Sequence, residues 1–394
     1  MASDFYRNRG KRLREESSVL DCIHRDLVSQ KEGFSPASLL YLLDTCRDDL
    51  SKIYSFSFFF VPEEQKLEYD EGNIMHLAVL KNVPELVSAL IERCMDMTAR
   101  TKKGRSLMDL AMYGNSRFFP EKNNSVRVSM VHLLLDHQCN VKAHHIAEIL
   151  INRSPNMWEP DIMVRMVSVL PNILEINCPH YIDLENLGSN IPWVSARNDM
   201  LPLIHIAAYR KNRTVIMALL KKDAHFRHVS KFLNLNIIDC LFLNFSPQNL
   251  IQIHDILQIV LPMGIKIDVG LSRDRSPPLH IAVMYSFTLD IIELLLRYGA
   301  DPNGCFKGRC LLQLARSNAV RRLLLEHGAD PNIETSDFYC PLFNAISREE
   351  DLMYLEFGAD VSTWDRRGTS FFHHHFVRGN TEVIFKALQH LIQK

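Results

Sequence analysis

The chain has 394 residues, 47% hydrophobic and 23% charged, a balance typical of folded proteins and unlike that of disordered ones. Its 45 basic and 46 acidic residues give a formal net charge of −1, so no global field favours nucleic acid or an anionic membrane. Nine cysteines, thinly spread and without a CxxC pair, indicate free thiols rather than a secreted disulfide framework.

The first residues form a polar, basic arm. Residues 1–16 lack the apolar core of a signal peptide, and five Lys or Arg fall within residues 7–14. The arm is interpreted either as a nuclear-import signal or acidic-partner contact, or as a solvated disordered tail. Its basic residues are Arg7, Arg9, Lys11, Arg12 and Arg14.

Residues 17–70 are expected to form a helical N-terminal capping region. Helices are predicted near 15–30 and 36–53, the second with a cap in Ser35-Pro36. The apolar run Phe56–Val61 is expected to cover the exposed face of the first repeat, because an array needs a lid on its terminal unit. This run is far shorter than the roughly 20 residues of a membrane span, so no membrane insertion is expected.

Two phrases then recur along the chain. One combines an apolar helix with Gly-Ala-Asp, and its copies are ELLLRYGADPN (293–303), RRLLLEHGADPN (321–332) and DLMYLEFGADVS (351–362). The other precedes the leucine runs, and its copies are NIMHLAVLKN (73–82), LPLIHIAAYRKN (201–212), SPPLHIAVMYS (276–286) and CPLFNAIS (340–347). Such internal similarity predicts a stack of repeated units.

The residues of one unit have a physical logic. Pro278 suits the first turn of a helix, and the small Ala282 lets a neighbouring helix approach closely. His280 can hydrogen-bond the loop backbone and so tie adjacent units together. Gly299 ends the second helix as a left-handed C-cap, and Asp301 opens a turn. Each unit is therefore a helix, a turn, a helix and a polar finger, and stacking supplies its core.

These units resemble ankyrin repeats, whose signature includes T-P-L-H-x-A and about 33 residues per unit. The resemblance implies an all-α solenoid of stacked helix–turn–helix units with finger loops. It is best at 276–303 and good at 72–103 and 201–230, whereas the units at 304–332 and 333–362 have first-helix regions about four residues shorter than usual.

We expect six parts in the chain. They are a basic arm (1–16), a helical cap (17–70), ankyrin-like repeats with an insertion at 117–127 (71–142), degenerate helical repeats (143–200), repeats of which the second is decayed (201–268), and ankyrin repeats with a C-terminal cap (269–394).

No catalytic or metal site is predicted. Nucleotide-binding, hydrolase and zinc-protease motifs do not occur in the sequence, so we expect no enzyme, no cofactor and no small-molecule substrate. The runs His373–His375 and His144-His145 are the metal suspects, but adjacent histidines on a helix are expected to point in different directions. Cys305 and Cys310 flank a finger and are given a structural role.

The resemblance implies that a protein partner meets the concave surface and its fingers. Trp364 beside two arginines has the composition of a binding hot spot, and the alternative is that it packs on a neighbouring unit. Phe118 and Phe119 in the insertion are either an exposed anchor or a plug. The candidate partner-binding residues are Trp364, Asp365, Arg366, Arg367, Asp337, Lys307, Arg309, Phe118 and Phe119.

Asn303 and Asn332 stand at the finger position where, in the ankyrin family, asparagines can be hydroxylated. The leading hypothesis for function is a non-catalytic scaffold or adaptor that binds one or more proteins and not nucleic acid. The alternatives are a substrate-recognition subunit of a ubiquitin ligase and a nuclear regulatory cofactor imported through the basic arm. We expect the protein inside the cell, in the cytoplasm, the nucleus or both.

Overall fold

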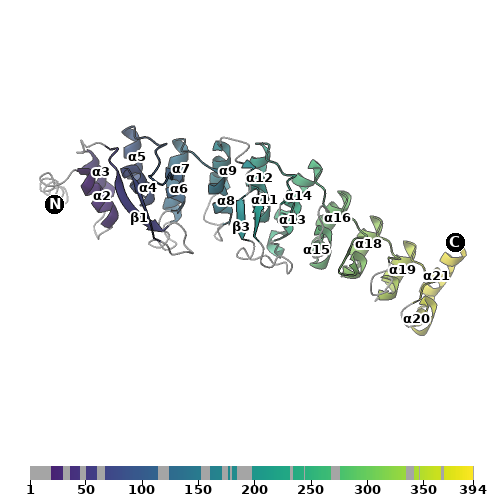
Figure 1. The fold of residues 1–394 in the computed structure, drawn as a ribbon. Helices are drawn as coiled ribbons and strands as arrows, with labels where there is room; N and C mark the ends of the chain where they lie inside the picture. The colour runs from purple at the N-terminus through teal and green to yellow at the C-terminus, as the bar shows by residue number, and fades with distance from the viewer. Residues whose placement is uncertain are drawn as a thin grey trace. The chain divides into compact units, whose positions relative to one another are not determined.

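The computed structural model describes most of the chain as pairs of short antiparallel helices (Figure 1). The described residues are 19–29, 36–44, 50–59, 67–113, 124–151, 160–170, 176–177, 180–183, 198–230, 234–243, 245–267, 276–333, 341–345, 347–364 and 368–393. The chain packs as two compact units, one of residues 1–178 with 221–223 and the other of residues 179–220 with 224–394.

The described residues of the first unit form four helix pairs and one hairpin. Its elements are α2 (Val19–Ser29), α3 (Pro36–Asp44), β1 (Tyr54–Phe59), β2 (Leu67–Gly72), α4 (Ile74–Leu80), α5 (Pro84–Glu92), α6 (Leu107–Tyr113), α7 (Asn124–Asp136), α8 (Ala143–Ile151) and α9 (Pro160–Val169). The first helices α2, α4, α6 and α8 contact one another in succession, and so do the second helices α3, α5, α7 and α9. Each pair therefore packs on the next in the same register.

The second unit repeats this arrangement. Its helices are α11 (Leu203–Tyr209), α12 (Arg213–Leu220), α13 (Ile237–Leu243), η3 (Pro247–Asn249), α14 (Leu250–Val260), η4 (Leu261–Met263), α15 (Pro278–Met284), α16 (Leu289–Arg297), α17 (Leu311–Leu314), α18 (Asn318–Glu326), η5 (Pro341–Asn344), α19 (Arg348–Glu356), α20 (Phe371–Val377) and α21 (Thr381–Gln393). Its strands are β3 (His180–Asp183), β4 (Asn198–Leu201), β5 (Cys305–Phe306) and β6 (Arg309–Cys310). Contacts run α11–α13–α15–α17–η5 among the first helices and α12–α14–α16–α18 among the second.

A reciprocal cap starts many of the first helices. In α4 the Asn73 amide oxygen accepts from the His76 backbone N–H at 3.2 Å, and the Asn73 N–H donates to Nδ1 of His76 at 3.2 Å. Asn236 and Asp239 form the same pair at the start of α13, with both distances 2.9 Å. The residue three positions after the cap needs only a side-chain atom that accepts a hydrogen bond from the cap's backbone N–H. Either His or Asp can therefore stand at that position without loss of the turn.

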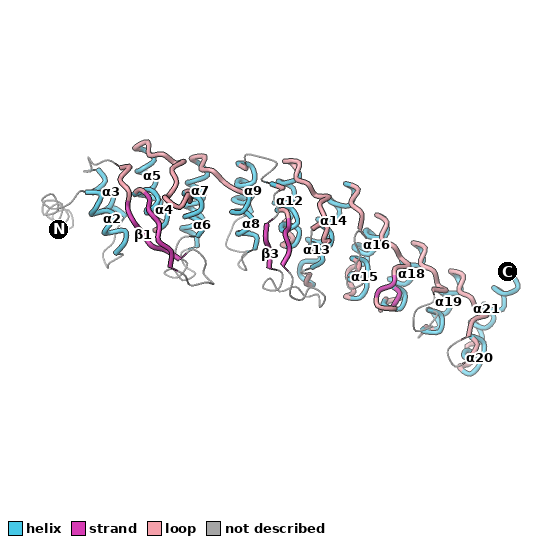
Figure 2. Tube along the Cα trace, in the orientation of Figure 1, coloured by secondary structure: helices cyan, strands magenta, loops and turns pink. Residues whose placement is uncertain are grey.

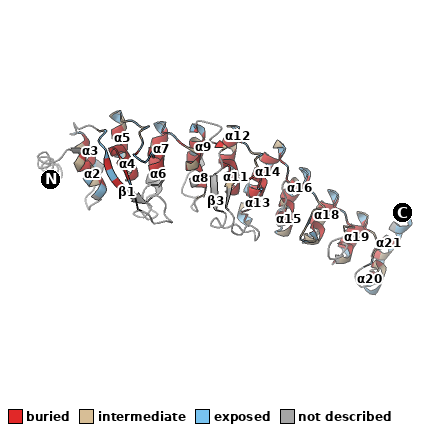
Figure 3. Cartoon of the chain, in the orientation of Figure 1, coloured by how far each residue is buried: buried red, intermediate tan, exposed pale blue. Residues whose placement is uncertain are grey.

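The second helices supply an apolar stripe that holds the stack together. On α16 the buried side chains are Ile291, Ile292, Leu295 and Leu296, which follow the spacing of one helical face. The buried residues of successive pairs make a continuous core through the helices of each unit (Figure 3). The helix ends turn sharply at glycines with positive φ, as at Gly299 (92°) and Gly328 (90°), where a Cβ would be strained.

The fold is mainly helical, as expected, but in the described parts of the chain three antiparallel hairpins accompany the helices (Figure 2). Within the expected helical cap, residues 54–59 form a strand paired with 67–72 instead of a helix, and the covering role expected of Phe56–Val61 stays a prediction. Of the helix predicted near 36–53, the structure describes α3 at Pro36–Asp44, and residues 50–53 are not helical. β3 and β4 also fall where only degenerate helical repeats were expected.

Two features of the C-terminal repeats follow from their sequences. α17 and η5 have four residues each, whereas α11, α13 and α15 have seven, as the shorter sequences predict. The terminal pair α20 and α21 leaves large apolar side chains exposed, although the outer face of a capping repeat is ordinarily polar. These side chains include Phe376, Val377, Phe385 and Ile392.

Candidate functional site: the finger loops of the C-terminal repeats

The finger loops after α16, α18 and α19 share one turn. Asp301, Asp330 and Asp360 each accept a hydrogen bond through Oδ1 from the backbone N–H two residues later, at 2.8–2.9 Å. This short-range contact fixes the start of each finger where the chain leaves the helix glycine. The finger loops are therefore the same structure repeated at a regular interval.

Asparagines join one finger to the next. Nδ2 of Asn303 donates to the carbonyl of Gly328 at 3.0 Å, and its Oδ1 accepts from the Asp330 N–H at 2.7 Å. Asn332 makes the same two contacts one repeat later, at 3.2 and 2.7 Å. Both amide groups are engaged in the folded loops, so any hydroxylase acting on them would meet an asparagine that bridges two fingers.

The finger that follows Asn303 is a small hairpin of β5 and β6. Lys307 and Gly308 form its two-residue loop, both with positive φ, and Lys307 Nζ lies 5.4 Å from the centre of the Phe306 ring. Lys307 and Arg309 are exposed at its tip. The hairpin therefore presents two cations on a defined backbone.

Trp364 lies on the last finger and is 63% exposed. Its backbone pairs with Ser370 in an isolated antiparallel bridge, which anchors the main chain beside α20. This exposure favours the binding interpretation over packing on a neighbouring unit. A large aromatic side chain in solvent on a fixed backbone has the character of a binding anchor.

Several predicted residues fall outside the described parts of the chain. They are Arg7, Arg9, Lys11, Arg12, Arg14, Phe118, Phe119, Asp337, Asp365, Arg366 and Arg367. Of the partner-binding candidates, the structure therefore places Lys307 and Arg309 together on one finger and Trp364 on another.

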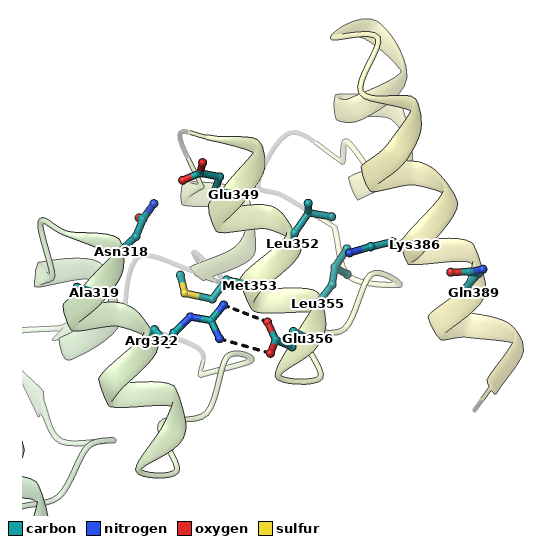
Figure 4. Close-up of a pocket in the computed structure, with 10 residues that line it drawn as sticks. All are labelled: Asn318, Ala319, Arg322, Glu349, Leu352, Met353, Leu355, Glu356, Lys386 and Gln389. Carbon is teal, nitrogen blue, oxygen red and sulfur yellow. Dashed lines mark hydrogen bonds and ion pairs between the residues drawn. The ribbon is translucent and has the colours of Figure 1, made fainter.

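A groove between second helices, not anticipated from the sequence, lies among α18, α19 and α21 (Figure 4). It has a volume of about 650 Å³, and Arg322 and Glu356 form a two-pronged ion pair across part of it, at 3.1 and 3.4 Å. Its lining residues are Asn318, Ala319, Arg322, Glu349, Leu352, Met353, Leu355, Glu356, Lys386 and Gln389. Adjacent repeats contribute these side chains, so no single motif could have revealed the groove.

Two of the repeated histidines make the contact expected of them, whereas both ring nitrogens of His280 are buried without a hydrogen-bond partner among the described residues. Nε2 of His76 lies 3.2 Å from the carbonyl of Ala99, and Nε2 of His205 lies 2.9 Å from the carbonyl of His228, so each ties its helix to the following loop. Burial lowers the pKa of His76, and it lowers the pKa of His205 to about 4. Both are therefore neutral near pH 7, because burial disfavours the charged ring more than the carbonyl contact favours it.

Asp109, His144 and His145 form a cluster whose ligand atoms lie within 4.8 Å of one another. The expectation that the adjacent histidines point apart is wrong here, because both Nε2 atoms approach Asp109 Oδ1, at 3.2 and 2.7 Å. The other Asp109 oxygen accepts from the N–H and the hydroxyl of Ser106, both at 2.7 Å. Burial raises the pKa of Asp109, but these hydrogen bonds outweigh it and hold the pKa well below its usual range.

The position of the proton on the His145 ring decides whether this cluster can bind a metal ion. The Lys142 backbone N–H donates to Nδ1 of His145 at 3.1 Å, so Nδ1 is an acceptor and the ring proton sits on Nε2, facing Asp109. A metal bound at Nε2 would need the opposite tautomer and would break this cap. The three residues thus fit a hydrogen-bond network between two repeats better than a metal site.

A clue in the sequence around this cluster was missed. Lys142-Ala143-His144-His145-Ile146-Ala147 follows the T-P-L-H-x-A spacing, with His145 and Ala147 at the positions of His280 and Ala282. Asp109 takes the corresponding place one repeat earlier, three residues after its cap Ser106. The unchanged pattern predicts the turn at His145, and the pattern with Asp in place of His predicts the turn at Asp109.

Within the described part of the chain, no helix is long and apolar enough to cross a bilayer.

One part of the chain matches a family of known repeats. Residues 249–335 match the family model for ankyrin repeats in three copies. Human BCL-6 corepressor-like protein 1 is 38% identical over 77 residues, which span 19% of this chain and only 4% of that protein. An ankyrin repeat domain of known structure from Acinetobacter baumannii AYE is 18% identical with a TM-score of 0.38, covering 48% of this chain and 96% of that one.

The matched region begins in the repeat α13–α14 and includes the finger with Asn303 and the start of the next. In the described residues the same reciprocal caps and helix pairs extend beyond this region. Repeats of this kind generally serve as protein-interaction modules. Residues 249–335 are therefore similar to ankyrin repeats, and the stacked helix pairs of the described residues continue the same arrangement on either side of them.

Proposed function

We propose that this protein is a non-catalytic scaffold or adaptor that binds a protein partner through the finger loops of its C-terminal repeats. The observation that carries the proposal is the 63% exposure of Trp364 on a finger whose backbone is held by pairing with Ser370. Tryptophan is among the residues enriched where interface energy concentrates. The neighbouring Arg366 and Arg367 add the other residue type enriched there.

The fingers have the rigidity that a binding surface needs. Asn303 and Asn332 link successive loops through two hydrogen bonds each, so three fingers are held at fixed spacing before a partner arrives. Pre-ordered loops lose less conformational entropy on binding than mobile ones do. Lys307 and Arg309 supply positive charge at the first of these fingers, which favours a partner with acidic side chains there.

The assignment of a non-catalytic role rests on how the histidines are used. His76, His145 and His205 occupy equivalent turns and spend their Nε2 protons on structural hydrogen bonds. A catalytic group must instead present its proton or lone pair to a substrate. The recurrence of one arrangement supports a role in the fold at each of these positions.

Quantitative affinity capture of wild type and two variants tests the proposal. Trp364→Ala removes the proposed anchor, and Tyr298→Ala is the matched control, because Tyr298 is a 42% exposed aromatic at the end of α16. Loss of a hot-spot tryptophan costs at least about 2 kcal/mol, which is roughly a thirtyfold loss of affinity. We expect one set of proteins to fall with Trp364→Ala alone, while circular dichroism shows all three chains equally folded. Equal capture by all three would contradict the proposal.

A second candidate function is that of a nuclear regulatory cofactor. Its supports are the basic residues within 7–14 and the similarity to a protein named as a corepressor-like protein, which is confined to 77 residues. A reporter fused to residues 1–20 should accumulate in the nucleus, and the same fusion with the five basic residues changed to Ala should not. A wild-type fusion spread evenly through the cell would remove this candidate.

A further inference from the structure

The hairpin finger of β5 and β6 places two cysteines directly opposite each other. Cys305 pairs with Cys310 and Phe306 with Arg309, across a loop of Lys307 and Gly308. The loop residues have φ of 50° and 76°, as a type I′ turn requires. Both cysteines are free thiols in this structure.

This register suits a bond between the two sulfur atoms. In a hairpin with a two-residue loop, the pair next to the loop exchanges backbone hydrogen bonds, and the following pair is the non-bonded kind, with Cα atoms about 4.5 Å apart. Side chains of such a pair lie on the same face of the hairpin. A disulfide needs Cα atoms roughly 4.4–6.8 Å apart, a range that includes the usual spacing of a non-bonded pair.

We propose that Cys305 and Cys310 form a reversible disulfide across this hairpin, which makes the finger a site of thiol oxidation by small-molecule disulfides. This assignment does not depend on the protein-binding proposal. It does bear on it, because Lys307 and Arg309 lie between the two cysteines and would be held by the bond.

The surroundings of the two thiols define their roles. Cys305 is exposed, and its Sγ lies 3.7 Å from the carbonyl of Asn303. Cys310 is 1% exposed and caps the first turn of α17, where its N–H donates to the Gln313 side chain at 3.3 Å. Cys305 therefore meets an oxidant from solvent first, and Cys310 acts second, after its side chain turns from the helix toward Cys305.

The chemistry balances with glutathione disulfide as the oxidant. The Cys305 thiolate attacks one sulfur of glutathione disulfide, which forms a mixed disulfide and releases one glutathione. The Cys310 thiolate then attacks the Cys305 sulfur, forms the Cys305–Cys310 bond and releases the second glutathione. Each cysteine loses its proton to solvent, and two electrons pass from the pair to the oxidant.

The protonation of the thiols makes the reaction dependent on pH. Burial and the nearby Asp301 charge raise the pKa of Cys305, and burial raises the pKa of Cys310. Both are therefore mainly protonated at pH 7, and only the thiolate attacks a disulfide. The rate of bond formation should rise roughly tenfold per pH unit between pH 7 and pH 8.5.

Peptide mapping of the full-length protein tests the proposal. The reduced chain is incubated with glutathione disulfide at pH 8.5, remaining thiols are blocked with N-ethylmaleimide, and trypsin then cuts after Arg297, Lys307, Arg309 and Arg316. We expect peptide 298–307 joined to peptide 310–316, lighter by two hydrogen atoms than the two reduced peptides together. The linked product should exceed the glutathione adduct of Cys305 at least tenfold.

Two controls separate this outcome from ordinary surface oxidation. Cys94 is also exposed, and it reports how much glutathione adduct an isolated cysteine of this chain takes up. Cys310→Ser removes the second thiol but keeps a side chain that can cap α17, and it should leave the glutathione adduct on Cys305 unresolved. Equal adducts on Cys305 and Cys94 in the wild-type chain, with no linked peptide, would overturn the proposal.

Discussion

Lys211 provides the sharpest test of how burial acts in this fold. It lies between α11 and α12, and only 7% of it is exposed. Its Nζ donates to the Tyr209 carbonyl at 2.8 Å and lies 5.4 Å from the centre of the Tyr209 ring. Burial lowers the pKa of Lys211 from 10.5 to about 7, with a smaller contribution from Arg210 in the same direction and an opposite one from Cys240.

This pKa corresponds to a cost in stability. The folded lysine binds a proton less readily than the unfolded one, so between pH 7 and pH 10.5 the unfolded chain holds more protons and stability rises with pH. The lowered pKa amounts to a cost of about 4 kcal/mol at pH 7. Lys211→Met removes this cost but also loses a hydrogen bond of about 1.5–3 kcal/mol, so we expect a net gain of about 2 kcal/mol at pH 7.

Urea unfolding followed by circular dichroism at pH 7, 8, 9 and 10 measures this effect. The advantage of Lys211→Met should shrink by roughly 1.4 kcal/mol per pH unit and reverse near pH 9, because the neutral lysine of wild type keeps its hydrogen bond without the cost of burying a charge. Lys221→Met, at an exposed lysine after α12, is the control and should leave the pH dependence unchanged. A Lys211→Met chain less stable than wild type at every pH, with a parallel curve, would refute the reasoning.

Three further predictions follow from individual hydrogen bonds and charges. Asn332→Ala should lower the free energy of unfolding by about 1–2 kcal/mol and speed hydrogen exchange at the Asp360 amide, because that amide and the Gly358 carbonyl lose their partner. Burial raises the pKa of Asp351 to about 7, so the folded chain keeps this carboxyl protonated where the unfolded chain does not, and stability falls as pH rises from about 4 to 7. Asp351→Asn carries no charge at any of these pH values and should melt higher than wild type at pH 8 but not at pH 4. Asp109→Asn should cost about 1.5–3 kcal/mol, whereas EDTA or added zinc should leave the melting temperature of wild type unchanged, in line with a hydrogen-bond network.

Much of the fold could be predicted where helix ends carry chemical markers. Gly299 and Gly328 adopt the positive φ that a C-cap requires, and His205 makes the expected contact with the next loop. The short helix α17 also follows from its shortened sequence. In each case a local residue determines a local conformation, so the sequence alone is enough to predict that part of the fold.

The remaining features depend on neighbours distant in sequence. The pair α8–α9 packs like a repeat although α9 lacks a glycine of the usual kind at its end, and the contact between Asp109 and His145 joins residues 36 positions apart. The exposure of Trp364 likewise depends on what its finger packs against, so the sequence left two alternatives open. The groove around Arg322 and Glu356 is formed by three helices together, and no one of them predicts it.

Site-specific photo-crosslinking tests the protein-binding account most directly. p-Benzoylphenylalanine placed at Trp364 or, as control, at Tyr298 would be activated in cells that express the full chain, and crosslinked proteins would be identified by mass spectrometry. The account predicts a discrete protein adduct from position 364 that is absent from position 298. Adducts from position 298 alone, or the same adducts from both positions, would contradict binding through the C-terminal fingers.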